Sequence, residues 1–170
     1  MGKEAVFLGG EKVKRKPEII VRGRDDIEHY KEERDHILIS ITDPYDTNPK
    51  LPKNPCRLDT LKLRFHDWDD KQKYDIQHKY KDSKTAKQMV FSSKKDAKKI
   101  VEFVRFYDGV VDAIYCQCAA GISRSAGVAA ALAHCLHGYD HEFFERYIPN
   151  RRIYRLILGE WYDLPNKAGN

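Results

Sequence analysis

The sequence predicts an α/β fold in which a parallel-rich central sheet of about four to five strands carries helices on both faces. Short apolar runs of strand length alternate along the chain with segments of helical periodicity, and this alternation is typical of parallel sheets. One strand-like run also passes through a tight loop of small residues directly into a long Ala-rich helix. The chain has 170 residues, 41% of them hydrophobic, which suits a single domain over residues 1–170.

Five runs combine strand length with apolar or β-branched content and are expected to form strands. They are residues 5–8, 18–22, 36–41, 58–65 and 110–115. Gly9-Gly10 is expected to turn the chain after the first of them. Residues 42–60 carry Pro44, Pro49, Pro52 and Pro55 and are expected to be mostly loop.

The helical segments are expected between these strands and after the last one. Residues 25–34 have helical spacing, with Asp25 as the capping residue. The other expected helices begin at Ser93, run from Arg124 to Gly138, cover residues 140–147, and begin after Pro149-Asn150. Residues 71–88 contain lysines at six positions and little apolar content, so they are expected to form a lysine-rich insertion or mobile lid.

Charge and composition narrow the range of partners. The net charge of +5 suits an anionic substrate, but the basic residues are too dispersed to favour nucleic acid. No apolar run approaches the roughly 20 residues of a membrane span, so no membrane association is expected. The four cysteines are not spaced as a disulfide framework, which favours a cytoplasmic protein.

The loop between the last expected strand and the Ala-rich helix has the features of an anion site. Cys118 stands where the strand ends and Arg124 where the helix begins, with small residues between them. Backbone N–H groups at a helix N-terminus, together with the helix dipole, attract an anion. The Arg124 guanidinium provides donors matched to phosphate oxygens, and the same field stabilises a thiolate on Cys118. A thiolate beneath a bound phosphate is a nucleophile directed at phosphorus.

The segment from Cys118 to Ser125 reads Cys-Ala-Ala-Gly-Ile-Ser-Arg-Ser, which is Cys-x5-Arg followed by Ser. It resembles the signature loop of the cysteine-dependent protein tyrosine and dual-specificity phosphatases, in the compact form of small bacterial- or viral-type members. The resemblance extends from about residue 36 to about residue 160 and is loose outside the signature loop. It implies the phosphatase α/β sandwich and a hydrolase that needs neither metal nor cofactor. Gln117 departs from the family, which usually has His before the cysteine.

The resemblance also implies roles for the residues of the loop. Cys118 would form a cysteinyl-phosphate intermediate, Arg124 would hold the phosphoryl oxygens, and Ser125 would hydrogen-bond the sulfur as it leaves. The remaining loop residues would bind the phosphate, or related anions such as sulfate and vanadate: Ala119, Ala120, Gly121, Ile122 and Ser123.

A general acid must protonate the leaving oxygen. The family takes this proton from an Asp in a Phe-x-Asp setting, which Phe65-His66-Asp67 matches, so Asp67 is the expected acid. Asp69 and Asp70 remain alternatives, because the 51 residues from Asp67 to Cys118 exceed the roughly 30 to 35 expected from the family. The lysine-rich insertion at 71–88 accounts for the extra length.

Several alternatives stay open. The expected substrate is a phosphorylated protein or peptide bearing phosphotyrosine, with phosphoserine and phosphothreonine as further candidates. RNA 5′-phosphates or phosphoinositides are the second hypothesis, motivated by the lysines of 71–88. A phosphate-binding module that has lost turnover is the third, motivated by Gln117.

Two further hypotheses concern the cysteines. Cys116 should face the same side of its strand as Cys118, and core packing is favoured for it over a redox role because a bridge across one residue is strained. A metal site built from Cys116, Cys118, His134, Cys135 and His137 is not favoured, since no pair has the usual Cys-x2-Cys spacing.

Overall fold

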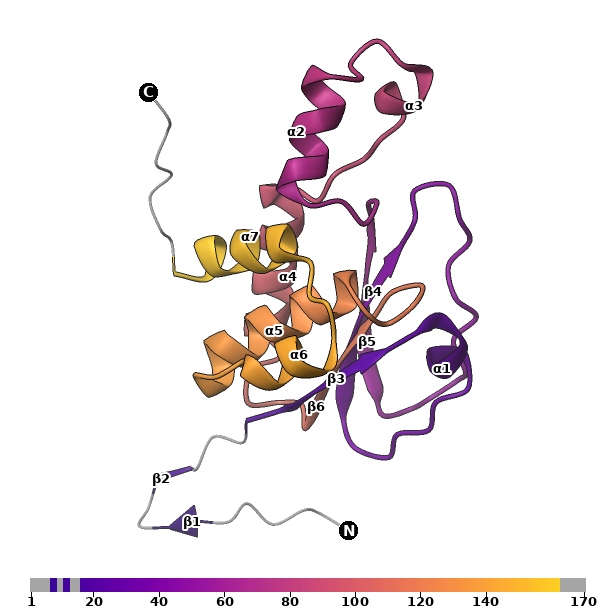
Figure 1. Cartoon of the computed structure of the whole chain (residues 1–170). Helices are drawn as coiled ribbons and strands as arrows, with labels where there is room; N and C mark the ends of the chain where they lie inside the picture. The colour runs from indigo at the N-terminus through magenta and orange to yellow at the C-terminus, as the bar shows by residue number, and fades with distance from the viewer. Residues whose placement is uncertain (1–6, 9–10, 13–15, 163–170) are drawn as a thin grey trace.

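The computed structural model of the chain describes residues 7–8, 11–12 and 16–162. Its centre is a sheet of four parallel strands, which confirms the expected α/β fold (Figure 1). In spatial order these strands are β3 (Glu18–Arg22), β6 (Ala113–Gln117), β4 (His36–Thr42) and β5 (Arg57–Arg64). The two outer pairings and the central one are all parallel, so the carboxyl ends of the strands meet at one edge of the sheet.

A separate antiparallel pair precedes this sheet in the chain. It consists of β1 (Phe7–Leu8) and β2 (Glu11–Lys12). The first expected strand is therefore present at Phe7–Leu8, whereas its other residues and the turn at Gly9-Gly10 lie outside the described residues.

The central strand β4 is buried along its whole length, because the sheet is covered on both faces. Ile37, Ile39 and Ile41 belong to the larger apolar cluster on one face, and Leu38 belongs to a smaller cluster on the other. This alternation follows from the period of two along a strand. The same alternation places Cys116 in β6 and Cys118, directly after it, together in the larger cluster, as expected from their spacing.

Four helices lie over the face that carries the larger cluster (Figure 1). They are α4 (Lys94–Phe106), α5 (Arg124–His137), α6 (His141–Arg146) and α7 (Arg151–Trp161). Ser93 caps α4 through the expected capping box with Asp96, and Asn150 caps α7 through a bond from Ile153 N. The Ala-rich α5 is almost wholly buried and ends at Gly138, whose φ of 82° is left-handed.

Among the described residues, the helix on the opposite face is the short α1 (Arg24–Glu28). The expected helix over 25–34 was too long, and Asp25 is not its cap, because Gly23 occupies the N-cap position. After α1 the chain is not helical, and two of its side chains, Tyr30 and Glu32, contact residues of the sheet. Tyr30 Oη bonds His36 Nε2 at 2.7 Å, and Glu32 accepts a bond from Tyr115 Oη at 2.9 Å.

The lysine-rich segment 71–88, expected as an insertion or mobile lid, contains two helices that the sequence did not predict. It forms α2 (Asp70–His78) and α3 (Lys84–Lys87), which project from the end of the sheet (Figure 1). A capping box stabilises the start of α2, since Asp69 accepts a bond from Gln72 N and the Gln72 side chain accepts one from Asp69 N. The capping box therefore stabilises α2, which has few apolar residues to bury. Throughout the part of the chain that the structure describes, every helix is too short or too polar to span a membrane.

Candidate active site

The loop that joins β6 to α5, residues 118–124, lies at the carboxyl edge of the sheet. It is called the phosphate loop below, after the role that the sequence predicts for it. Its first half is held by the turn that follows β3. Cys118 N donates to Arg22 O at 3.4 Å, and Arg24 N donates to Ala119 O at 3.0 Å. The loop is therefore fixed to the neighbouring strand at the point where Cys118 leaves the sheet.

Gly121 is required by the conformation and packing of this loop. Its φ is 68°, in the left-handed region that L side chains rarely adopt. A Cβ atom at this position would also lie 2.4 Å from Gly23 N, inside any acceptable contact. Two backbones thus approach each other more closely than a side chain allows.

The second half of the phosphate loop is fixed to the segment before α7. Ser123 O accepts bonds from Gly127 N at 2.8 Å and Asn150 N at 3.0 Å, and Ile122 O accepts one from Ile148 N at 3.1 Å. The loop is consequently anchored on both sides by backbone hydrogen bonds to distant parts of the chain.

Cys118 is 2% exposed and lies at the base of this loop. Its Sγ atom is 3.1 Å from Oγ of Ser125, which is fully buried in the first turn of α5. A hydroxyl in this position can donate a hydrogen bond to a thiolate and stabilise it as a leaving group. The structure therefore brings the expected nucleophile and the expected serine into contact.

Arg124 is the other expected residue at the start of α5, and it is 5% exposed. Its Nη1 atom donates to Asp43 Oδ1 and to Phe65 O, each at 2.9 Å. Its Nε atom is buried and has no hydrogen-bond partner among the described residues. A buried donor without a partner costs free energy, so this N–H is suited to binding an anion that enters the loop.

Asp43 was missed by the sequence analysis, which treated residues 42–60 only as a loop. It directly follows β4, and its position after a strand at the carboxyl edge of the sheet was the signal that could have identified it. Two arginines hold the segment 43–48 that carries Asp43. Arg64 donates to the backbone oxygens of Asp43, Pro44 and Asp46, and Arg24 donates to the side chains of Asp46 and Thr47.

The three candidate acids after β5 occupy different environments. Asp67 Oδ1 accepts bonds from Ser123 Oγ at 2.8 Å and from Asn150 Nδ2 at 2.9 Å, so its carboxylate lies against the phosphate loop. Asp69 is the N-cap of α2, and Asp70 pairs with the guanidinium groups of two arginines on α7, Arg152 and Arg155. Of the three, Asp67 is the one with a hydrogen bond to a phosphate-loop side chain.

Asn150 is a second residue that the sequence analysis did not assign to the site. It was seen only as the start of the last helix, and it does cap α7. Its Nδ2 group also donates to Asp67 Oδ1 and to Trp68 O, while its backbone N–H donates to Ser123 O. One residue thus joins the candidate acid and α7 through its side chain and the phosphate loop through its backbone N–H.

Gln117 points to the opposite face of the sheet from Cys118, because adjacent residues of a strand alternate. It is 1% exposed, and its Oε1 atom accepts a bond from Ser40 Oγ at 2.7 Å. A hydrogen bond is therefore present at this position, but it ties β6 to β4 instead of reaching the sulfur.

Two other cysteines, Cys116 and Cys135, have raised thiol pKa values. Cys116 is fully buried, and burial together with the neighbouring Cys118 raises the pKa of its thiol. Burial also raises the pKa of Cys135 to about 12. Among the described residues, no group of three or more His, Cys, Asp or Glu side chains is placed to hold a metal ion.

Comparison with known proteins finds matches among solved structures alone. No model of a known protein family matches the chain. No curated protein matches it either. A crystal structure of PTPMT1 in complex with PI(5)P has a TM-score of 0.46 and 16% identity over 79% of this chain and 81% of that one. A crystal structure of PTPMT1 alone has a TM-score of 0.46 and 14% identity over 86% of this chain and 90% of that one. The assignment of chemistry rests on the geometry of the site.

Proposed function

We propose that the chain is a cysteine-dependent phosphatase that hydrolyses phosphotyrosine in proteins through a cysteinyl-phosphate intermediate. One observation carries the proposal: Cys118 and the unpartnered Nε of Arg124 are both buried at the phosphate loop, with Ser125 in contact with the sulfur. In this proposal residues 1–170 act as one catalytic domain, and α2–α3 is an insertion beside its active site.

The first chemical step transfers the phosphoryl group to sulfur. The Cys118 thiolate attacks phosphorus while the bond from phosphorus to the tyrosyl oxygen breaks. Protonated Asp67 donates its proton to that departing oxygen. The loop N–H groups and the Arg124 guanidinium hold the equatorial oxygens, where the charge of the transition state lies. Both bonds that Asp67 accepts use Oδ1, which leaves Oδ2 to carry the proton.

The second step regenerates the enzyme. The Asp67 carboxylate takes a proton from water as that water attacks the phosphorus of the intermediate, and the sulfur–phosphorus bond breaks. The electron pair returns to Cys118, and the Ser125 hydroxyl donates a hydrogen bond to the thiolate that forms. Inorganic phosphate is released, and Asp67 is left protonated for the next cycle.

The proposal is tested with para-nitrophenyl phosphate and a phosphotyrosine peptide, without added metal. Cys118→Ser is expected to abolish turnover while the variant still binds the peptide. Asp67→Asn is expected to slow hydrolysis of the peptide by about 10²- to 10⁴-fold, the usual contribution of a general acid. Asp69→Asn is the matched control, because its carboxylate caps a helix instead of meeting the phosphate loop.

Three results would redirect the assignment. Loss of activity in Asp69→Asn but not in Asp67→Asn would move the acid to Asp69. Phosphopeptide binding without any turnover by the wild-type chain would favour a binding module. Faster hydrolysis of RNA 5′-phosphates or phosphoinositides than of phosphotyrosine peptides would replace the protein substrate.

A further inference from the structure

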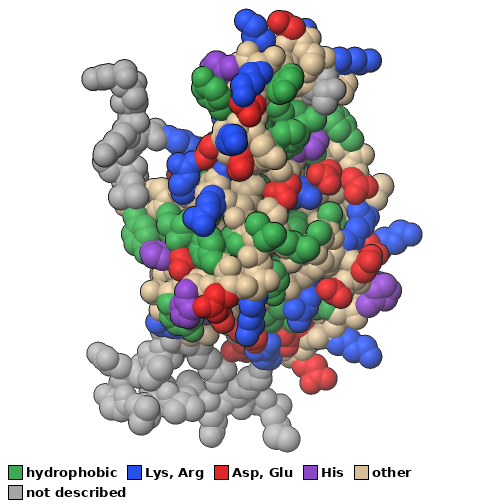
Figure 2. Space-filling model, in the orientation of Figure 1, with side chains coloured by type: hydrophobic (Ala, Val, Ile, Leu, Met, Phe, Trp, Pro, Cys, Tyr) green, Lys and Arg blue, Asp and Glu red, His purple; other side chains and the backbone are tan. Residues whose placement is uncertain are grey.

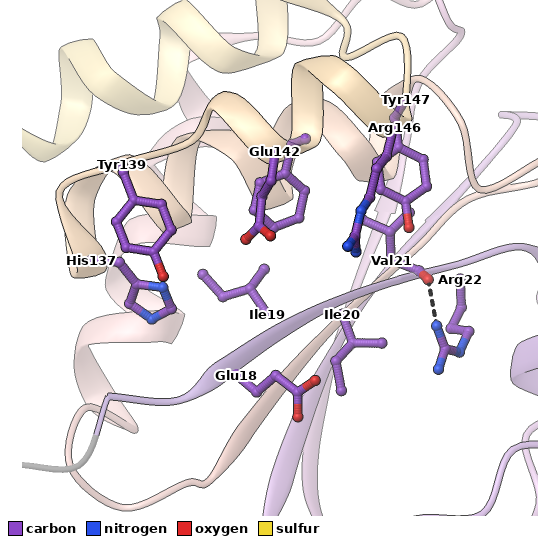
Figure 3. A pocket seen from close by; sticks show the side chains of 11 residues that line it. Glu18, Ile19, Ile20, Val21, Arg22, His137, Tyr139, Glu142, Arg146 and Tyr147 are labelled. Atoms are coloured by element: carbon purple, nitrogen blue, oxygen red, sulfur yellow. Dashed lines mark hydrogen bonds between the residues drawn. The ribbon is translucent and has the colours of Figure 1, made fainter.

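A groove of about 290 Å³ runs along the outer edge of β3, and none of residues 118–124 lines it. One wall is the whole of β3, and the other is formed by the end of α5 and by α6 (Figure 3). The groove thus has the length of the five-residue strand, about 16 Å at the usual rise per residue.

The β3 wall presents to this groove backbone groups that no described strand pairs with. β3 is the terminal strand of the sheet, and among the described residues only β6 pairs with it. Glu18 N donates to Asp112 O and Arg22 O accepts from Cys118 N, so the even-numbered residues of β3 face β6. The backbone groups of Ile19 and Val21 therefore face the groove. The Arg22 guanidinium covers one of them, donating to Val21 O at 2.9 Å (Figure 3).

Charge is distributed unevenly along the groove. Arg146 and Arg22 lie at one end, while Glu142 lies near its middle and Glu18 at the other end (Figure 3). Glu18 also pairs with Arg34 at 2.8 Å, which fixes its carboxylate beside the strand. An occupant with acidic groups at the arginine end and basic groups at the glutamate end would complement both.

The arginine end of the groove abuts the phosphate loop. The residues that follow β3 bond the loop at Ala119, through Arg24 N. The residues that follow α6 bond the loop at Ile122, through Ile148 N. Both walls of the groove therefore end on the loop that holds Cys118.

We infer that this groove binds an extended segment of a phosphoprotein substrate, which adds to the sheet as a strand beside β3. The inference rests on the proposed phosphatase function and extends it to how a substrate is recognised. A strand added at a sheet edge gains affinity from main-chain hydrogen bonds and specificity from its side chains. The segment places acidic side chains beside Arg22 and Arg146, displaces Arg22 from Val21 O, and places basic side chains beside Glu142 and Glu18.

The test compares phosphotyrosine peptides that differ only in this segment. The long probe carries phosphotyrosine, a short glycine spacer, a pair of aspartates, a run of about five Val and Thr residues to match the strand, and a pair of lysines. It is made with the extension on either side of the phosphotyrosine. The short probe stops after the spacer, and a third probe is the long one with N-methylated amides in the Val/Thr run. Each kcat/KM is divided by that for para-nitrophenyl phosphate.

The long probe in one of its two orientations is expected to exceed the short one by about 10-fold or more, as two or more net hydrogen bonds would give. N-methylation should remove this gain, because the strand then lacks its donors. Ile19→Pro should remove it as well, since proline deletes the outward N–H without touching the bonds to β6. Glu142→Lys should reduce the gain in kcat/KM of the long probe over the short one. Glu145→Lys, an exposed change on α6 outside the groove, should leave that gain unchanged.

Equal rates for the long, short and N-methylated probes in both orientations would overturn the inference while leaving the proposed function intact. A gain for the long probe that survives N-methylation would also overturn it. If the wild-type chain hydrolyses none of the probes, docking is measured by fluorescence anisotropy of the labelled long and N-methylated peptides, which separates failure of the groove from failure of the phosphatase. Sedimentation tests whether a second copy of the chain occupies the edge of β3. Concentration-dependent dimers that the long probe does not dissociate would show that it does.

Discussion

The phosphate loop and the α2–α3 segment are neighbours joined through Asp67, yet they are held in opposite ways. The loop is fixed by backbone bonds to Arg22, Arg24, Ile148 and Asn150, and its central glycine packs against another backbone. In α2–α3, among the side chains that the structure describes, Ile76 is the buried one, and the segment bears exposed lysines (Figure 2). It is tethered mainly by polar contacts, such as that of Asp70 with Arg152.

This difference shows where a change should matter. The phosphoryl transition state of the proposed reaction needs donors in fixed positions, and a loop bonded on both sides is suited to supply them. A segment that buries little apolar surface opens at low free-energy cost and can vary without disturbing those donors. The predictions below test this contrast from its strongest expected effect to its weakest.

Gly121→Ala should have the largest effect, because the new Cβ would force the phosphate loop away from Gly23. We expect kcat for para-nitrophenyl phosphate to fall by about 10²-fold or more, as a displacement of about 1 Å can cause. Gly159→Ala is the matched control: its Cβ meets nothing within 4 Å, and alanine favours the helix α7. Wild-type turnover in Gly121→Ala would show that the loop is not rigid.

Asp43→Ala should have the next largest effect, because it leaves Arg124 Nη1 with Phe65 O alone. We expect kcat to fall by about 10- to 100-fold and the inhibition constant for inorganic phosphate to rise, through a misplaced guanidinium. Asp46→Ala is the control, since Arg24 keeps its bonds to Thr47 and Asn48. If Asp43→Ala lowers the thermal stability but leaves the affinity for phosphate unchanged, the role of Asp43 is structural.

Acid should affect the sheet that carries the phosphate loop. Burial lowers the pKa of His36 below its ordinary 6.5, so the folded chain binds this proton less readily than the unfolded chain. Its contribution to stability is full above pH 6.5 and is lost as the pH falls below that value, by at most about 1.4 kcal/mol per pH unit. Thermal unfolding measured from pH 8 to 5 should show a falling Tm. His36→Asn should flatten this dependence, and an unchanged slope would exclude His36 as its source.

Replacing lysines in α2–α3 should have the smallest effect. Lys81, Lys84 and Lys87 are exposed, and their joint change to Gln should alter kcat/KM for para-nitrophenyl phosphate by less than about twofold. The same variant measures their role in substrate choice. A much larger loss with RNA 5′-phosphates or phosphoinositides would show that these lysines bind a polyanionic substrate beside the active site.

The contrast also explains what could be predicted from the sequence. The phosphate loop could be located because strand, loop and helix are contiguous, so local pattern carries the information. Asp43 and Asn150 reach the site across the fold, and Asp67 and Asn150 are 83 residues apart in the chain. The periodicity of apolar residues along the chain does not indicate contacts between residues so far apart in the sequence. The α2 helix was missed because helical periodicity is read from buried apolar residues, whereas a capping box and ion pairs stabilise this helix.

The position of Asn150 late in the sequence determines when the candidate active site can assemble during protein synthesis. Cys118, Arg124 and Asp67 have all been added to the chain before residue 150, but the residue whose side chain bonds Asp67 and whose backbone N–H bonds the phosphate loop has not. A nascent polypeptide whose residue 150 is still inside the ribosome would contain each reacting group and yet lack their assembly. Under the proposed function, hydrolysis of phosphate esters would then begin only as α7 emerges and docks.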